Sequence, residues 1–387
     1  MSETLRVGQA LFENGPPARL QRYLGLTKGD QRNIGRRAFI VAMLGWVPLI
    51  VLAGIDRSDG VKSLLLGIDV HARYLVAAPL LVLAEAECGP RLNAIVRHFT
   101  DAGLVPESEL GRYNAAVGFT GILLHSRAAE IIVFALAYLL VCAAAFSLPF
   151  DQLPLWHKAG NAITIFSLAG WWHVLVSLPL LLALLLGWAW RFVLWAQLLW
   201  RIARIKLRIL ASHPDGAAGL AVIGYSLRAF SPIAMALATI IAGRSAQIVL
   251  VEGALPRGTT AFSAGLLVVI GVSFAVPLSF FTPILMKALQ RGSFEYGALA
   301  NRAGTVFEEK WVGPNRLIDS SVLEQPDFSA TTDLYAIVAN VYSLRLVPID
   351  LKSAAALGTA LLLPFIPVVF LALPVEQILA ELRGLLF

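Results

Sequence analysis

Charged residues are scarce in this chain. Asp, Glu, Lys and Arg together make up 14% of its 387 residues, whereas soluble domains carry roughly 25%. Hydrophobic residues make up 58% of the chain, and the mean hydropathy is +0.73. This shortage of charge excludes an ordinary soluble domain and predicts an integral membrane protein, with the lipid bilayer as its partner.

Cysteine and histidine are also few. The two cysteines, Cys88 and Cys142, lack the paired spacing of a disulfide framework or a zinc site. The six histidines are scattered, and none belongs to a metal-binding motif such as HExxH. We therefore expect no metal site and no cofactor.

The net charge of +6 is not distributed as nucleic-acid binding requires. Basic residues cluster between hydrophobic runs, as in membrane proteins that follow the positive-inside rule. No basic face or RNA-binding motif accompanies them, so we expect no nucleic-acid partner. Residues 1–37 are rich in arginine and lack a secretory signal peptide, which predicts a cytoplasmic N-terminal extension.

Seven hydrophobic runs predict an all-α polytopic membrane protein. The predicted spans cover residues 38–55, 74–87, 129–148, 169–200, 229–251, 261–286 and 354–372. The second span is short and is expected to end at Gly89-Pro90, while residues 61–70 before it are either interfacial or re-entrant. Lys and Arg concentrate in alternate loops, which predicts a multi-pass protein of the inner membrane with a cytoplasmic N-terminus.

The spans divide the chain into regions. Residues 38–286 hold the first six spans, and residues 287–352 form a cytoplasmic segment in which a helix starts near Asp327 or Ser329. Residues 353–387 hold the last span and an amphipathic helix over 375–387. The C-terminus is expected outside, or inside if residues 354–387 form a hairpin. No internal repeat supports an inverted-repeat transporter.

The fourth span is the longest predicted helix. A helix over residues 169–200 would extend about 48 Å at ~1.5 Å per residue, more than the ~30 Å hydrocarbon core of a bilayer. We expect Pro214 to end this helix at an elbow, His213-Pro214-Asp215-Gly216, and Asp215 to cap the next helix. The alternative is a proton-transfer pair of His213 and Asp215, although no nucleophile or metal cluster accompanies them.

Arg244 lies deep in the fifth span. It stands some fifteen residues from the inner end, roughly 22 Å at ~1.5 Å per residue. An arginine at that depth costs several kcal/mol unless it reaches water, a partner or the interface. Either it lines a water-filled pathway that attracts anions, or it extends outward or pairs with Glu252, Asp69 or Asp151.

Two acids mark the inner end of the second span. Glu85 and Glu87 are two positions apart and lie on different faces of a helix, and Arg191 in the fourth span lies at similar depth. A Glu85–Arg191 or Glu87–Arg191 ion pair would lock two helices together, and the alternative is a proton or cation site. Arg91 follows Glu87 by four residues, but Pro90 is expected to interrupt that geometry.

The elbow also carries a family resemblance. A run of tryptophan and basic residues precedes His213-Pro214-Asp215-Gly216-Ala217-Ala218-Gly219-Leu220. This stretch resembles a family of bacterial polytopic membrane proteins whose members carry HPD and a GGL pattern there, with no assigned activity. The resemblance extends to residues 75–76, 79–81, 84–85, 326–329 and 333–334, and to Pro364 and Pro367. Ala218 departs from the double glycine. The resemblance implies a polytopic architecture and no particular function.

We hypothesise a channel or transport protein for small ions or solutes, assembled as a homo-oligomer. Spans five to seven would form the pathway, with Arg244, Gln247 and Thr282 as the candidates for lining and selectivity. Seven spans with a cytoplasmic N-terminus match insect chemoreceptor channels in number and orientation, which is an analogy of topology alone.

Two other functions stay open. A membrane-embedded enzyme acting on an amphiphilic substrate would need Glu85, Glu87, His213 and Asp215 to converge at the cytoplasmic interface. A sensor or scaffold would instead use residues 287–352 to bind a soluble partner. The sequence contains no specific catalytic motif, which favours a function other than catalysis.

Overall fold

The computed structural model describes residues 11–12, 34–56, 58–147, 153–159, 166–253, 256–312 and 326–372. Nearly all of the predicted N-terminal extension and the whole amphipathic helix over residues 375–387 lie outside these ranges. Helices make up almost all of the described chain, which confirms the all-α polytopic fold. Within the described residues, β-type pairing is limited to one isolated bridge between Lys158 and Phe166.

Six helical stretches are long and apolar enough to cross a membrane. They are α3 (Ile34–Asp56); α8 (Arg127–Ser147); α9 (Leu168–Trp172) with η6 (His173–Ser177) and α10 (Leu178–Ile202); η7 (Ala221–Gly224) with α11 (Tyr225–Glu252); α12 (Arg257–Ala275) with η8 (Val276–Phe281) and α13 (Thr282–Trp311); and α15 (Leu351–Leu362) with η10 (Leu363–Phe365) and α16 (Ile366–Ala372). A bent pair raises the number to seven. In it, α4 (Ser58–Leu65) meets α5 (Ile68–His71) at 64°, and α5 continues through η2 (Ala72–Ala77) into α6 (Ala78–Asp101).

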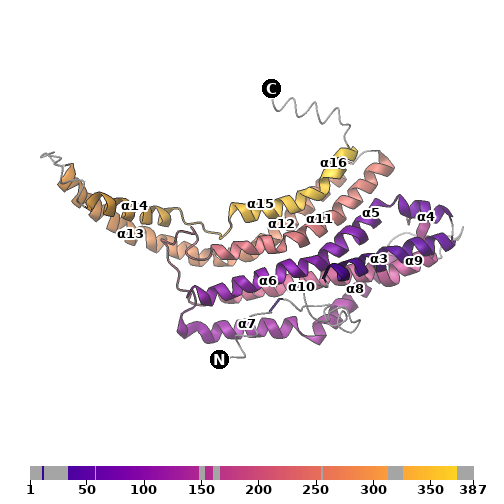
Figure 1. The fold of residues 1–387 in the computed structure, drawn as a ribbon, viewed down its shortest axis with the longest axis horizontal. Coiled ribbons are helices and arrows are strands. Elements are labelled where there is room, and N and C mark those ends of the chain that lie inside the picture. Colours follow the sequence, from indigo (N-terminus) through magenta and orange to yellow (C-terminus); the bar gives the residue numbers. More distant parts are fainter. Residues whose placement is uncertain are drawn as a thin grey trace, which may run out of the picture.

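The spans lie side by side along the long axis of the molecule (Figure 1). Helix α11 packs against α6 on one side and α15 on the other, while α3 and α10 cover the remaining faces of α6. We call the end that carries residues 203–220 the elbow end. The opposite end, which carries η5 (Leu155–His157), is the cavity end.

The second span is longer than predicted. The expectation that Gly89-Pro90 ends it is wrong, because α6 continues through both residues to Asp101. A proline inside a helix costs about 3 kcal/mol, since it removes one backbone hydrogen bond and crowds the preceding turn. Here α6 buries many side chains on both sides of the proline, such as Leu81 and Phe99, and this packing outweighs the local cost.

The sixth predicted span, residues 261–286, is also longer than predicted. Helices α12 and α13, joined by the 3₁₀ turn η8, run for 55 residues, or about 80 Å at ~1.5 Å per residue. Pro277 and Pro283 stand at the first turns of η8 and α13, where a missing N–H is tolerated. The helix therefore continues through much of the segment that begins at residue 287.

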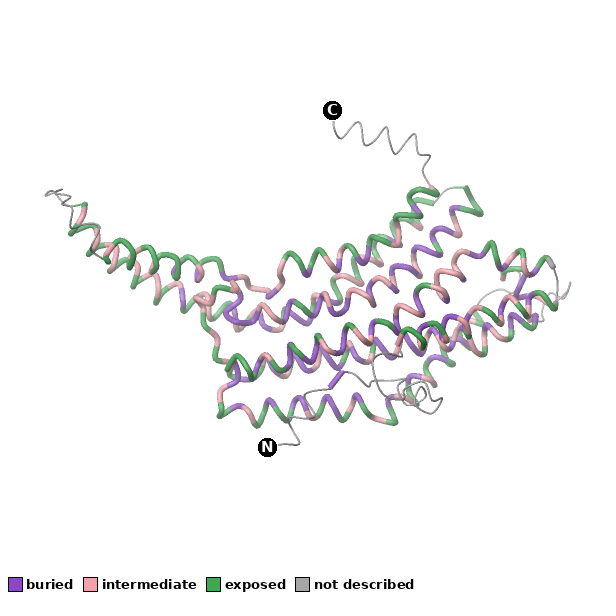
Figure 2. Tube along the Cα trace, viewed as in Figure 1, coloured by how far each residue is buried: buried purple, intermediate pink, exposed green. Residues whose placement is uncertain are grey.

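Helix α14 (Asp327–Tyr342) begins at one of the two predicted residues and packs antiparallel on α13. Glycines on α13 allow this close approach: a Cβ atom at Gly304 would lie 2.8 Å from Tyr335 Oη, and one at Gly292 would lie 2.8 Å from Val341 Cγ1. The α13–α14 hairpin projects beyond the bundle at the elbow end, and most of its residues are exposed or half-buried (Figures 1 and 2).

The core follows the centre of the bundle. Burial is heaviest along α6, α10 and α11 (Figure 2), where Trp195 and Phe230 are among the largest fully buried side chains. The outer face of α12 is apolar and open, with Phe262 71% exposed and Val268 64% exposed. Such a surface suits lipid rather than water, which agrees with the membrane assignment.

Residues 91–128, between the second and third predicted spans, are largely helical. They comprise the end of α6, the turn η3 (Glu107–Glu109) and α7 (Leu110–Leu124). Tyr113 Oη donates to the Val96 carbonyl, and the Arg201 guanidinium stacks 4.1 Å above the Phe119 ring. These contacts fix α7 against the elbow-end halves of α6 and α10.

Candidate functional site

The second span breaks at the cavity end, between α4 and α5. The break leaves backbone N–H groups without helical partners, and Gln247 Oε1 on α11 accepts the N–H of Ile68 at 2.8 Å. Gln247, predicted as a pathway residue, thus uses its side-chain oxygen to hold this break against α11.

Two π-helical turns adjoin the break. One is η2 in the second span and the other is η6 in the fourth. The Tyr74 ring of η2 meets the His173 ring of η6 edge to face, with 5.8 Å between ring centroids. Because π turns are rare and frequent at functional sites, this part of the bundle is the first candidate for function.

A cavity of about 420 Å³ lies beside these irregular turns. Its polar lining consists of Asp69, Arg73, His157, His173 and Arg244, and its apolar lining includes residues of α8 and α10. The cavity is therefore built by the second to fifth spans and the η5 segment. This differs from the expectation that spans five to seven form the pathway.

The cavity carries an excess of positive charge. Arg73 forms an ion pair with Asp69, four residues away on the same helix. Arg244 is exposed to the cavity, and no described carboxylate lies within ion-pair distance of it. Of its three predicted acidic partners, Asp69 pairs with Arg73, Glu252 is exposed at the end of α11, and Asp151 lies outside the described residues.

Two buried histidines form one wall of the cavity. His157 Nε2 lies 3.1 Å from His173 Nδ1, and the Trp156 ring contacts both imidazole rings. Burial, together with the positive charge of Arg73, lowers the pKa of His157 to about 3. His157 is therefore neutral near pH 7.

The start of α9 positions His157. The Ser167 side chain accepts the N–H of Gly170 as the helix cap and donates to the Trp156 carbonyl at 2.6 Å, while the Ser167 N–H donates to the His157 carbonyl. A Cβ atom at Gly170 would lie 2.7 Å from that carbonyl oxygen, so glycine is needed there. The sequence pattern alone gave no signal for this histidine pair.

Thr282 is far from the cavity. The neighbouring Phe281 stacks on Phe99 with ring centroids 6.3 Å apart, and Phe99 lies 30 residues beyond Asp69, about 45 Å at ~1.5 Å per residue. The structure therefore does not bring Thr282 together with Arg244 and Gln247.

Glu85 lies at the centre of a buried ion triad. Its carboxylate is 2.9 Å from Arg191 Nη2 on α10 and 2.6 Å from Arg37 Nη2 on α3. The three side chains are only 2–12% exposed, and the Arg191 guanidinium also stacks 4.5 Å over Trp188. The Glu85–Arg191 contact was predicted. Arg37 was missed because it precedes the first span by one residue and reads as a loop charge.

Glu87 takes a different partner. It forms an ion pair with Arg91 at 2.5 Å, and both side chains are about half exposed. The expectation that Pro90 would disturb this spacing is wrong, because α6 keeps its helical geometry through the proline. Glu87 does not contact Arg191, which pairs with Glu85.

The elbow is organised by Asp215. Its carboxylate accepts the backbone N–H groups of Ala217, Gly219 and Ala221 at 2.8–3.1 Å, and His213 Nδ1 lies 2.9 Å from it. Burial opposes its ionisation, but these donors outweigh burial and hold the pKa of Asp215 below its usual value. The carboxylate thus occupies an anion-binding concavity of its own loop.

Two predictions about the elbow need correction. Helix α10 ends at Ile202, well before Pro214, so the proline does not end it. Asp215 does bond the N–H of Ala221, the first residue of η7, but it lies six residues earlier and the cap position is Leu220. Residues 203–220 form an extended loop. The sequence did not predict it because the helical pattern continues up to Pro214.

Arg345 clamps the elbow from outside. Its Nη2 donates to the Asp215 carbonyl at 2.7 Å, its backbone N–H donates to the Gly216 carbonyl at 2.8 Å, and its Nη1 donates to Ile349. The linker between α14 and α15 is thereby joined to the elbow. This contact spans 130 residues and has no local sequence signal.

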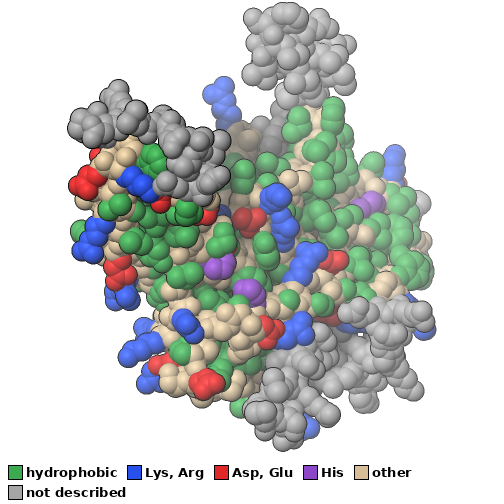
Figure 3. All heavy atoms as spheres, turned by 60° about the vertical axis from the view of Figure 1, so that its left-hand side comes forward, with side chains coloured by type: hydrophobic (Ala, Val, Ile, Leu, Met, Phe, Trp, Pro, Cys, Tyr) green, Lys and Arg blue, Asp and Glu red, His purple; other side chains and the backbone are tan. Residues whose placement is uncertain are grey.

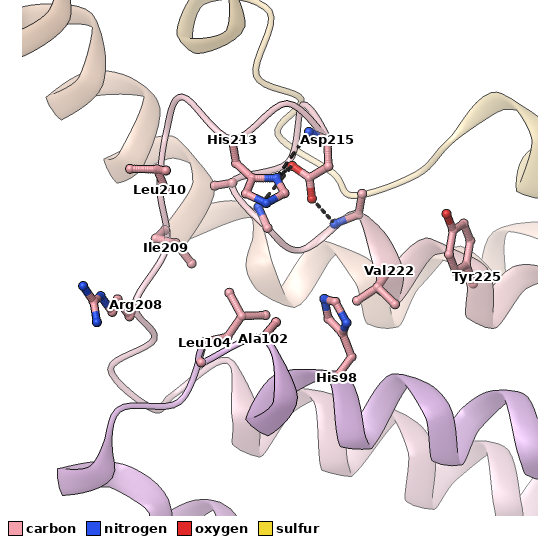
Figure 4. A pocket seen from close by; sticks show the side chains of 14 residues that line it. His98, Ala102, Leu104, Arg208, Ile209, Leu210, His213, Asp215, Val222 and Tyr225 are labelled. Atoms are coloured by element: carbon pink, nitrogen blue, oxygen red, sulfur yellow. Dashed lines mark hydrogen bonds and ion pairs between the residues drawn. The ribbon is translucent and has the colours of Figure 1, made fainter. Parts of the chain in front are cut away.

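A pocket of about 690 Å³ lies between the elbow and α6. Figure 4 shows His98 pointing from α6 toward the loop, while His213 and Asp215 turn toward each other. Within the described residues no hydrogen bond joins His98 to that pair. The nearby Ser212 hydroxyl lies 3.2 Å from Tyr296 Oη, and in the described elbow no hydrogen bond joins that hydroxyl to His213 or Asp215.

The residues required for the enzyme hypothesis do not converge. Glu85 belongs to the buried triad, Glu87 pairs with Arg91 on the surface, and the His213–Asp215 pair lies in the elbow loop. Nor does the described part of the chain contain a group of three His, Cys, Asp or Glu side chains placed to hold a metal ion.

Comparison of the chain with models of known families, with curated proteins and with solved structures finds no match. The family resemblance of the elbow therefore stays a prediction.

Proposed function

We propose that the protein is a channel or transporter for small anions and that the anion first binds in the cavity around Arg244. The observation that carries this proposal is the composition of the cavity, which four membrane-spanning helices line and to which the second and fifth spans contribute two arginines and one aspartate. Because Asp69 pairs with Arg73, the charge of Arg244 is in excess.

The surroundings strengthen this preference for anions. The rest of the lining is largely apolar and includes Val70, Val141 and Leu178. A positive charge acts more strongly between such low-dielectric walls than in water. The neutral His157 adds a hydrogen-bonding group to the cavity without changing the charge balance.

The irregular helices around the cavity also support a transport function. Backbone that departs from α-helix at membrane depth is tolerated where it is buried in protein or lines a cavity, and broken helices form the binding sites of many transporters. Here a broken span and two π-helical turns adjoin the same cavity.

Three parts of the proposal rest on the sequence alone. These are the inner-membrane location, the cytoplasmic N-terminus and the homo-oligomeric state. A cytoplasmic N-terminus would place the cavity on the outer side. The scaffold alternative would use the α13–α14 hairpin and likewise stays a prediction.

The test is ion flux through the purified protein in liposomes. We expect the wild type to pass a small anion such as chloride in preference to potassium, and Arg244→Gln to shift the reversal potential toward that of potassium. Arg302→Gln is the matched control, because Arg302 is an exposed arginine on the α13–α14 hairpin.

Two results would contradict the proposal. One is the absence of flux from wild-type protein that is folded by size-exclusion chromatography. The other is a reversal potential that is the same for the wild type and for Arg244→Gln.

A further inference from the structure

A third cavity, of about 560 Å³, lies at the elbow end between residues 203–211 and α13. Its charged lining consists of Lys206, Lys287, Arg291 and Glu295. We infer that this groove binds the headgroup of an acidic phospholipid, with the ammonium groups of Lys206 and Lys287 as the recognition elements. The inference does not depend on the proposed anion transport.

The charge balance of the groove favours an anion. Arg291 Nε pairs with Glu295 at 2.7 Å, which neutralises the acid of the lining. Lys206 and Lys287 are both exposed, and in the described part of the chain neither has a carboxylate within ion-pair distance. Two positive charges from two separate segments thus face one groove, and no described carboxylate pairs with either.

The position of Lys287 places the groove at the level of the headgroups. It is the first charged residue after residues 258–286, a charge-free run of 29 residues. That run is about 43 Å long at ~1.5 Å per residue, which exceeds the ~30 Å hydrocarbon core but matches the ~40–45 Å that includes the polar layers. The other basic residues of this end also spread over its surface among apolar side chains (Figure 3).

The remaining lining distinguishes a lipid from a free anion. Leu207, Ile284 and Ala288 give the groove apolar walls beside the two ammonium groups. Nearby, the Arg204 guanidinium stacks 3.7 Å from the ring of Trp200, which is 41% exposed. Basic pockets flanked by exposed tryptophan are typical of the membrane–water interface. An amphiphile fits both the charges and the apolar walls, whereas inorganic phosphate uses only the charges.

The experiment is a native mass-spectrometry titration of the full chain with phosphatidylglycerol and, separately, with phosphatidylcholine. We expect the wild type to prefer phosphatidylglycerol. The double variant Lys206→Gln/Lys287→Gln should bind it about 30-fold more weakly, from ~1 kcal/mol for each lysine and 1.4 kcal/mol for each factor of ten. The control Lys62→Gln/Lys352→Gln removes two exposed lysines that lie outside the groove and should bind as the wild type does.

Three outcomes would overturn the inference. They are equal binding of the two lipids by the wild type, equal weakening of the two double variants, and displacement of phosphatidylglycerol by millimolar inorganic phosphate. The last outcome would assign the groove to a free anion. All three are independent of ion flux, so they leave the role of Arg244 untouched.

Discussion

Glu85 accepts from arginines on two other helices, Arg37 on α3 and Arg191 on α10. All three side chains are nearly or fully buried, and such an arrangement tolerates the loss of one member badly. Removing one partner of a buried pair leaves a charge that neither water nor protein compensates. The triad therefore holds three spans together. It is the site where a single substitution has the largest expected effect on stability.

We predict that Glu85→Gln lowers the free energy of unfolding by about 3–5 kcal/mol, because two buried guanidinium groups then lose the Glu85 carboxylate that pairs with both. The measurement is denaturant titration in mild detergent. Glu87→Gln is the matched control, since its half-exposed pair with Arg91 is worth at most about 1 kcal/mol. Similar losses of unfolding free energy for the two variants would show that the triad does not hold the three spans together.

His157 predicts a specific pH dependence of stability. Its pKa is about 3 when folded and about 6.5 when unfolded, so between these values the unfolded chain binds more protons. Stability should therefore fall as the pH is lowered below 6.5, by up to about 1.4 kcal/mol per pH unit. The positive charge of Arg73 opposes the protonation of His157, and His173 is the other titratable group that faces it.

The measurement is the free energy of unfolding at pH 7, 6 and 5 for the wild type and for His157→Gln. The free energy of unfolding of the variant should depend less steeply on pH than that of the wild type, by the contribution of about one proton. An unchanged slope would mean that His157 already takes up its proton in the folded protein.

At the scale of elements, the sequence predicts the spans well and their irregularities poorly. Periodic hydrophobicity and flanking charges located all seven stretches, and the charge-free run over residues 258–286 marks its span clearly. The prediction that Pro90 ends its helix was wrong because tertiary burial of α6 outweighs the local cost of a proline. The turns η2 and η6 have no sequence signature, so the cavity between them was not predictable. Arg345 was missed because its contacts lie 130 residues away.

The packing of α11 on η2 depends on one glycine. A Cβ atom at Gly243 would lie 2.4 Å from Ala72 Cβ, so Gly243→Ala must push the two helices apart beside the cavity. We predict a loss of about 1–3 kcal/mol, the usual cost of overpacking, seen as a lower midpoint of thermal unfolding. Gly265→Ala on α12 is the control, because nothing lies within 4 Å of its Cβ position. It should leave stability unchanged or raise it by up to ~1 kcal/mol, as replacing a helical glycine does. Equal midpoints for the two variants would contradict this packing.

At the scale of the whole molecule, the two ends have different character. The cavity end holds Arg244 and the histidine pair among irregular helices. The elbow end holds the loop around Asp215, the α13–α14 hairpin and the lysine-lined groove. A bundle that crosses the membrane puts these two ends on opposite sides of it, and both proposals depend on that arrangement.

The most direct test is the sidedness of two single cysteines. In a chain with Cys88 and Cys142 replaced by serine, Arg257→Cys reports the cavity end and Arg302→Cys reports the hairpin. A membrane-impermeant maleimide added to intact cells stripped of their outer membrane should label position 257 alone. In inverted vesicles it should label position 302 alone. Labelling of both positions from the same side would contradict the arrangement of the spans.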